Sequence, residues 1–100
     1  MELAGSQKRH LRSLGHRLDV AISLGKGGLS RGVAAALKEL FTRHELLKVR
    51  LPALPPEERE SLARELAGAV GATIAGALGR TVLLYKPNDT LPAEKRIRLA

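Results

Sequence analysis

The sequence predicts an α/β fold, a single two-layer domain whose elements run α-β-α-β-α-β-β and form a mixed four-stranded sheet. Apolar residues recur at helical spacing in three segments, and short apolar runs lie between and after them. A chain of 100 residues is also long enough for one core. Because strand–helix–strand units have right-handed crossovers, the first three strands are expected to pair in parallel. The last two should form an antiparallel hairpin.

The first part of the chain predicts a basic helix, a strand and a second helix. Leucines recur at helical spacing among cations over residues 11–18, so the first helix is expected to reach Leu18. The apolar run 20–24 favours a strand because it is rich in β-branched residues. Ser30 is a suitable N-cap for the second helix, whose apolar stripe covers residues 33–41.

The middle of the chain predicts a strand followed by an acidic helix. Residues 45–51 alternate in polarity, which is typical of a strand that packs on one face and projects Lys48 and Arg50 from the other. A proline-rich connector then leads into a helix that begins with glutamates and can end at Gly71 in a left-handed cap. This acidic helix is expected to face away from any polyanion.

The end of the chain predicts a hairpin and a tail. Strands are expected at residues 72–75 and 81–85, with a glycine-containing turn between them. They complete a predicted domain of residues 1–87. Residues 88–100 are expected to form a C-terminal tail that is mobile or docks late.

The composition indicates a basic protein and is compatible with the cytoplasm, which is the location we expect. The net charge is +7, and only the segment 51–71 carries an acidic excess, so the fold can present one positive face, which is typical of a polyanion binder. The absence of cysteine excludes disulfides and thiolate metal sites. The N-terminus lacks the apolar core of a signal peptide, and no apolar stretch is long enough to span a membrane. We expect a monomer without metal, cofactor or membrane contact.

The segment Gly25-Lys26-Gly27-Gly28 lies where a predicted strand passes into a predicted helix. Glycines lack side chains, so a polyanion can approach the backbone N–H groups, and the helix that follows directs its dipole to the same point. The loop therefore predicts a phosphate site, although an isolated loop of this kind can also be a tight turn without a ligand. Valine at Gly27 is expected to block the approach and to resist positive φ.

Nucleotide-binding motifs fit the loop poorly. A Walker loop would need a Ser or Thr after the lysine, and a dinucleotide fingerprint would need glycine where the chain has Ser30. His44 and Glu45 begin a partial zinc-protease motif, but Lys48 occupies the position of its second ligand. We therefore expect no catalytic residues and no enzyme.

Four ordered segments carry a resemblance to a known family. They are Lys8-Arg9 with Leu11-Arg12, Leu24-Gly25-Lys26-Gly27-Gly28-Leu29-Ser30, His44-Glu45-Leu46-Leu47-Lys48-Val49-Arg50, and Gly79-Arg80-Thr81-Val82-Leu83-Leu84-Tyr85-Lys86. In these segments the chain resembles the bacterial YhbY-like RNA-binding proteins, whose domain is also called the CRM domain. The resemblance covers roughly residues 7–87.

The resemblance implies a fold similar to the C-terminal domain of bacterial translation initiation factor three. It also implies association with large ribosomal subunit precursors, so the expected ligand is structured RNA and in particular ribosomal RNA. Stacking on unpaired bases is not expected, because the chain has only two aromatic residues and one of them, Phe41, falls on a buried stripe. The predicted RNA-contact residues are Gly25, Lys26, Gly27, Gly28, Lys8, Arg9, Arg12, Lys48, Arg50, Arg80 and Lys86.

Two other functions stay open at this point. A basic module that binds acidic protein surfaces would show no dependence on RNA in pull-down experiments. A nucleotide-binding enzyme would show saturable affinity for mononucleotides and turnover.

Overall fold

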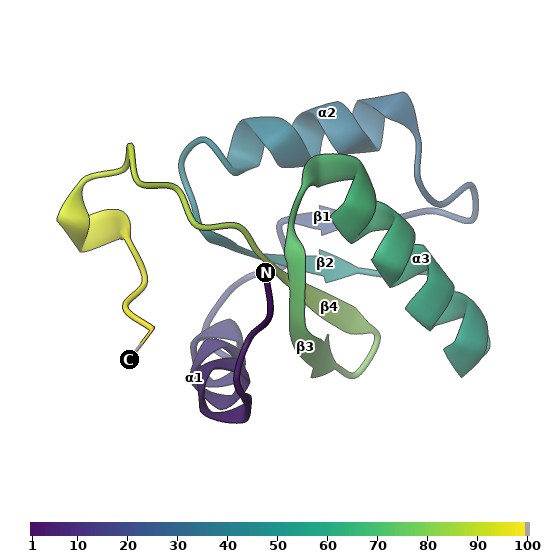
Figure 1. The fold of residues 1–100 in the computed structure, drawn as a ribbon. Coiled ribbons are helices and arrows are strands. Elements are labelled where there is room, and N and C mark those ends of the chain that lie inside the picture. The colour runs from purple at the N-terminus through teal and green to yellow at the C-terminus, as the bar shows by residue number, and fades with distance from the viewer. Residues whose placement is uncertain (100) are drawn as a thin grey trace.

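The computed structural model describes residues 1–99 and confirms the predicted order of elements (Figure 1). The elements are α1 (Gly5–Gly15), β1 (Ile22–Ser23), α2 (Arg31–Leu40), β2 (Leu46–Arg50), α3 (Pro56–Val70), β3 (Thr73–Leu78), β4 (Thr81–Tyr85) and a short 3-10 helix, η1 (Ala93–Lys95). No helix in this part of the chain is long and apolar enough to cross a membrane.

The four strands form one mixed sheet in the order β1-β2-β4-β3. β1 pairs with β2 in parallel, and β4 pairs antiparallel with both β2 and β3. The prediction that the first three strands pair in parallel was therefore wrong for β3, because β4 lies between β2 and β3. All five residues of β4 are buried, as expected for a central strand covered on both faces.

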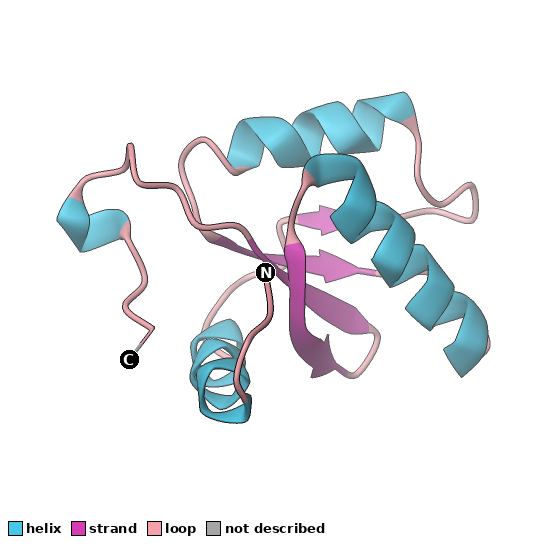
Figure 2. Cartoon of the chain, in the orientation of Figure 1, coloured by secondary structure: helices cyan, strands magenta, loops and turns pink. Residues whose placement is uncertain are grey.

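Helices cover both faces of the sheet, so the molecule has three layers rather than the two predicted (Figure 2). α2 and α3 cover one face, where Leu37, Leu66 and Leu84 belong to the larger apolar cluster. α1 crosses the other face, where Leu11 and Leu83 belong to a second cluster. The third layer forms because β2 and β4 each present apolar side chains on both faces.

The first helix is shorter than predicted. α1 ends at Gly15, and Leu18 lies beyond it with 37% of its surface exposed. A Cβ atom added at Gly15 would lie 2.5 Å from Leu83 Cδ1, so a larger residue there would require the buried Leu83 side chain to shift. The strand expected at 20–24 is also shorter, although the N–H groups of Ala21 and Leu24 still donate to the neighbouring β2 carbonyls.

Both predicted caps are confirmed. Ser30 Oγ accepts a hydrogen bond of 3.1 Å from the Val33 N–H at the start of α2. Gly71 ends α3 with φ of 71°, in the left-handed region that glycine favours. β3 runs three residues further than predicted and contains a bulge between Ile74 and Gly76.

The C-terminal segment docks on the domain, so of the two expected alternatives the mobile tail was wrong. The buried Glu45 carboxylate, only 1% exposed, accepts 2.6 Å hydrogen bonds from the backbone N–H groups of Asn88 and Ile97. Arg96 Nε lies 3.4 Å from the same carboxylate. Ile97 and Leu99 pack against the cluster beneath α1. Docking follows because a buried carboxylate needs donors, and this segment supplies them.

Candidate nucleic-acid interface

The ends of all four strands meet at one edge of the sheet, here called the loop edge. Ser23 at the end of β1 pairs with Arg50 at the end of β2. Arg50 in turn pairs with Thr81 at the start of β4, and Thr81 pairs with Leu78 at the end of β3. Since the glycine loop follows β1 directly, Lys26 lies at the same end of the sheet as Arg50 and Arg80.

The glycine loop is open to solvent. Gly25, Lys26 and Gly27 are exposed, and a Cβ atom added at Gly25 or Gly27 would meet no atom within 4 Å. The Gly28 N–H donates to the Gly25 carbonyl at 3.0 Å, which closes the turn. The expectation that Gly27 has positive φ was wrong, because the turn places its left-handed residue at Gly28, with φ of 66°.

The start of α2 faces this loop. Ser30 is its N-cap, and the side-chain hydroxyl accepts a hydrogen bond from the Val33 N–H. A helix start carries a partial positive charge, so the dipole of α2 adds to the charge of Lys26. The loop thus combines accessible backbone, a helix dipole and one formal cation.

A basic hollow of about 450 Å³ opens at the loop edge on the face that α1 covers. Lys48, Arg50 and Arg80 supply its charge. Val20, Leu78 and Thr81 complete its wall. The side chains of Arg50 and Arg80 are exposed and hydrogen-bond to nothing within residues 1–99, so both guanidinium groups are available to an anion.

Lys48 plays a second part in the fold. Its Nζ donates to the carbonyls of Gly15 at 3.1 Å and Leu18 at 3.3 Å, just beyond the end of α1. A cation at this position stabilises the negative end of the helix dipole. The prediction that Lys48 projects from the sheet face opposite the main core is confirmed, but the side chain is half-buried and bonded to carbonyls.

The predicted contact residues of α1 lie on the same face of the sheet as the basic hollow. Lys8, Arg9 and Arg12 are all exposed on a helix that packs across β2, β3 and β4. The Arg12 guanidinium covers Gly76 in β3, with Nε 3.5 Å from where a Cβ atom would be. These three cations extend the positive surface along α1.

Lys86 does not join the other predicted contact residues. It follows the end of β4, and the backbone N–H donates to the Glu45 carbonyl at the opposite edge of the sheet. Its Nζ donates to the Val70 carbonyl at 2.9 Å, where α3 ends. This partner could not be predicted, because Lys86 and Val70 meet only through the fold.

The acidic helix does not face away from the loop as expected. Glu58 and Glu65 of α3 line a hollow of about 260 Å³ together with Lys26, Gly27 and Gly28. The loop therefore has an acidic flank toward α3, and Arg50 and Arg80 line a separate hollow at the same end of the sheet.

Both aromatic side chains are buried. Phe41 and Tyr85 are each 3% exposed, so neither can stack on a base at the surface. Burial raises the pKa of the Tyr85 phenol, and the nearby Glu45 carboxylate raises it further, while Arg96 opposes the change. The prediction that Phe41 lies on a buried stripe is confirmed.

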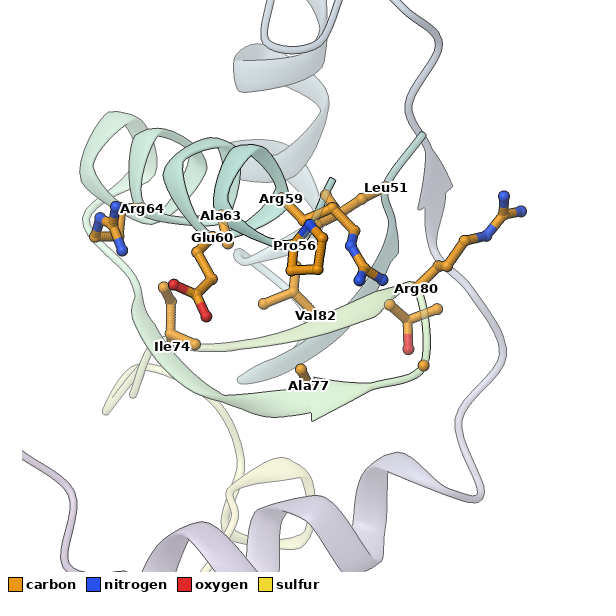
Figure 3. A pocket seen from close by; sticks show the side chains of 12 residues that line it. Leu51, Pro56, Arg59, Glu60, Ala63, Arg64, Ile74, Ala77, Arg80 and Val82 are labelled. Atoms are coloured by element: carbon orange, nitrogen blue, oxygen red, sulfur yellow. The ribbon is translucent and has the colours of Figure 1, made fainter. Parts of the chain in front are cut away.

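Arg59 of α3 was not among the predicted site residues. Its Nε atom is buried without a hydrogen-bond partner in the described part of the chain, and it lines a cavity between α3 and the β3–β4 hairpin (Figure 3). The signal was present, because Arg59 precedes Ala63 and Leu66 at the spacing of the buried stripe. An arginine on that stripe indicates a polar group directed into the fold.

The fold and the loop edge define a small α/β domain with an exposed glycine loop beside a basic hollow. Residues 3–86 match the family model described as the CRS1/YhbY (CRM) domain, and the chain belongs to this family.

Relatives in several bacteria agree with this assignment. A Pseudomonas aeruginosa protein named as a probable RNA-binding protein is 32% identical over 88 residues, which cover 88% of this chain and 85% of the relative. A Haemophilus influenzae protein named as an RNA-binding protein is 29% identical over 87 residues, covering 87% of this chain and 88% of the relative. A Staphylococcus aureus solution structure, described as a candidate RNA-binding protein, superimposes with a TM-score of 0.82 at 27% identity. That match covers 97% of this chain and 100% of the other.

Proposed function

We propose that this protein binds structured RNA at the loop edge and has no catalytic activity. The observation that carries the proposal is the convergence of the Lys26 loop, Arg50 and Arg80 on one exposed edge, where these side chains have no protein partner within residues 1–99. Cations held this way can exchange counterions for RNA phosphates without breaking internal bonds. The names of the relatives support RNA as the polyanion.

The proposed contacts fall into two groups. Backbone N–H groups of Gly25 and Gly27 approach phosphates directly, as glycine allows, while the Gly28 N–H holds the turn closed by donating to the Gly25 carbonyl. Side chains supply the charge around them. These side chains are Lys26, Arg50 and Arg80 at the loop edge and Lys8, Arg9 and Arg12 on α1, whereas Lys48 in the wall of the hollow is bonded to the Gly15 and Leu18 carbonyls. We assign Lys86 to the end of α3 instead, because its Nζ is bonded to the Val70 carbonyl.

Structured RNA fits this surface better than single strands. Both aromatic residues are buried, so the surface has no ring on which successive bases could stack. Phosphate contacts are set by the shape of a folded RNA and by the spacing of its backbone.

We further propose that the RNA is ribosomal RNA, bound during assembly of the large subunit, and that the protein acts in the cytoplasm as a monomer. The resemblance to YhbY-like proteins supports this assignment. Crosslinking in cells, followed by sequencing of the attached RNA, tests it. Enrichment of large-subunit RNA or its precursors is expected, and crosslinks spread in proportion to RNA abundance would contradict it.

The same cells distinguish RNA binding from binding to acidic protein surfaces. The protein is expected to associate with large-subunit precursor particles in untreated lysates. After ribonuclease treatment, it should no longer capture any of the proteins released from these particles. Capture of a protein partner that persists after complete RNA digestion would instead favour a protein-interaction module.

A further inference from the structure

A second cavity lies on the flank of α3 that faces away from the glycine loop (Figure 3). It has a volume of about 250 Å³, and the first half of α3 and the β3–β4 hairpin form its walls. Its apolar lining comes from Leu51, Ala63, Ile74, Ala77 and Val82. The cavity is smaller than the roughly 300–1,000 Å³ typical of cofactor and drug sites, so it suits a single flat ring system.

Arg59 gives this cavity an unused hydrogen-bond donor. The side chain reaches from α3 toward the strands, and its Nε atom is buried without a partner in residues 1–99 (Figure 3). A buried donor without an acceptor costs stability, so native structures rarely keep one unless water or a ligand satisfies it. An acceptor atom entering the cavity would remove that cost.

The charge around the cavity favours an anionic molecule. Arg64 and Arg80 accompany Arg59 in its lining, and Glu60 is the one acidic side chain there. Arg80 and Thr81 line both this cavity and the basic hollow at the loop edge. The two sites therefore share a rim at the β3–β4 turn although they open on opposite faces of the sheet, so one RNA molecule that passes around this turn can reach both.

We propose that the cavity takes one unpaired nucleobase of the RNA held at the loop edge; this rests on the proposed function. The base lies against the apolar lining and accepts a hydrogen bond from Arg59, while Arg80 at the shared rim binds the adjoining phosphate. Every base has an apolar face and ring or carbonyl acceptors, which match this lining. Phosphate contacts alone cannot distinguish one RNA sequence from another, so the cavity supplies selectivity for a bulged or looped nucleotide.

The test compares three kinds of RNA hairpin that share one stem sequence. One is fully paired, one carries a single bulged nucleotide, with each of the four bases in turn, and one carries an abasic ribose at the bulge. The abasic hairpin keeps the phosphate and the bend but lacks the base. The full-length protein is expected to bind the best bulged hairpin about tenfold more tightly than the abasic one.

Two variants and a control assign that preference to the cavity. Ala77→Phe fills the cavity, and Arg59→Met removes the donor while keeping an apolar side chain of similar reach. Both are expected to bind bulged and abasic hairpins equally, and to bind the paired hairpin like wild type. Ala93→Phe places the same ring on the exposed helix η1 and should retain the full preference. Thermal unfolding shows that each variant is folded.

The remaining outcomes separate the two proposals. Equal binding of bulged and abasic hairpins by wild type, with the paired hairpin still bound, overturns the base cavity and leaves RNA binding intact. A preference that survives in both variants shows that the base binds elsewhere. A preference lost in Ala77→Phe but kept in Arg59→Met supports the cavity and overturns the Arg59 hydrogen bond. Failure to bind any hairpin overturns RNA binding and the cavity together.

Discussion

Charged side chains are exposed at one edge of the sheet and hydrogen-bonded within the protein at the other. At the loop edge, Lys26, Arg50 and Arg80 are exposed and their side chains have no partner within residues 1–99. At the opposite edge, here called the tail edge, Glu45 is buried beneath the C-terminal segment and Lys86 is bonded to the end of α3. Strands β2 and β4 run from one of these edges to the other.

This difference separates a charge that serves stability from a charge available to a ligand. Charged side chains at the tail edge are hydrogen-bonded inside the protein, so removing one of these side chains leaves its buried partners unpaired. Charges at the loop edge are solvated, and removing one costs the fold little. The net charge of +7 is therefore a poor guide to the site, because only some of the cations are free to act.

The largest effect is expected from Glu45→Ala at the tail edge. The change leaves the N–H groups of Asn88 and Ile97 without their acceptor and should lower the free energy of unfolding by about 2–4 kcal/mol. Chemical denaturation measures the loss. Glu39→Ala, which removes an exposed carboxylate, serves as the control and should change stability by less than about 0.5 kcal/mol. Equal losses in the two variants would show that the Glu45 hydrogen bonds contribute little.

Neighbouring glycines at the loop edge should respond differently to valine. Gly28→Val must place a β-branched residue at positive φ and within 3.3 Å of Leu62, so we expect a loss of about 1–3 kcal/mol in stability. Gly27→Val meets open space and should unfold like wild type, yet bind RNA more weakly because the side chain blocks the backbone. Normal RNA binding by folded Gly27→Val would contradict the role of the loop backbone.

A pair of lysines contrasts the edges directly. Lys86→Ala removes the hydrogen bond to the Val70 carbonyl and should cost about 1 kcal/mol of stability while leaving RNA affinity unchanged. Lys26→Ala should leave the Tm unchanged and weaken RNA binding, with a salt dependence reduced by about one phosphate contact. Calorimetry and anisotropy titrations on both proteins measure these effects. If the two lysines exchanged roles, the division between the edges would be wrong.

The smallest effect is a pH dependence at the tail edge. Burial raises the pKa of Tyr85 above its ordinary value of 10.0, with Glu45 adding to the shift. The unfolded chain therefore releases this proton at lower pH than the folded protein. The contribution to stability is complete below pH 10.0 and is lost as the pH rises through the folded-state pKa. Unfolding midpoints of wild type should fall more steeply above that pH than those of Tyr85→Phe, and parallel curves would contradict the shift.

Features that depend on neighbouring residues could be predicted from the sequence. The Ser30 cap, the Gly71 cap and strand β4 follow from local residue preferences, and all three are present. The glycine loop was placed correctly for the same reason. The choice of Gly28 for positive φ could not be predicted, because it depends on the hydrogen bond that closes the turn to Gly25.

Features set by distant contacts could not be predicted. Whether β4 lies inside the sheet depends on the pairing of whole strands, and the docking of residues 88–99 depends on Glu45 finding donors more than forty positions away. For the same reason, sequence alone could not separate Arg50 and Arg80 from Lys48 and Lys86. The two lysines differ from the two arginines in that their side chains donate hydrogen bonds to backbone carbonyls.

The salt dependence of RNA binding tests the central claim most directly. Wild type, Arg50→Ala/Arg80→Ala and Lys38→Ala/Arg43→Ala are titrated onto one paired RNA hairpin at several salt concentrations. Both double variants lose two exposed cations, but only the first loses them at the loop edge. The loop-edge variant should bind more weakly, with a slope of log affinity against log salt that is shallower by about 1.5–2, and the control should match wild type. Equal slopes for the two variants would contradict the claim that the loop edge binds RNA.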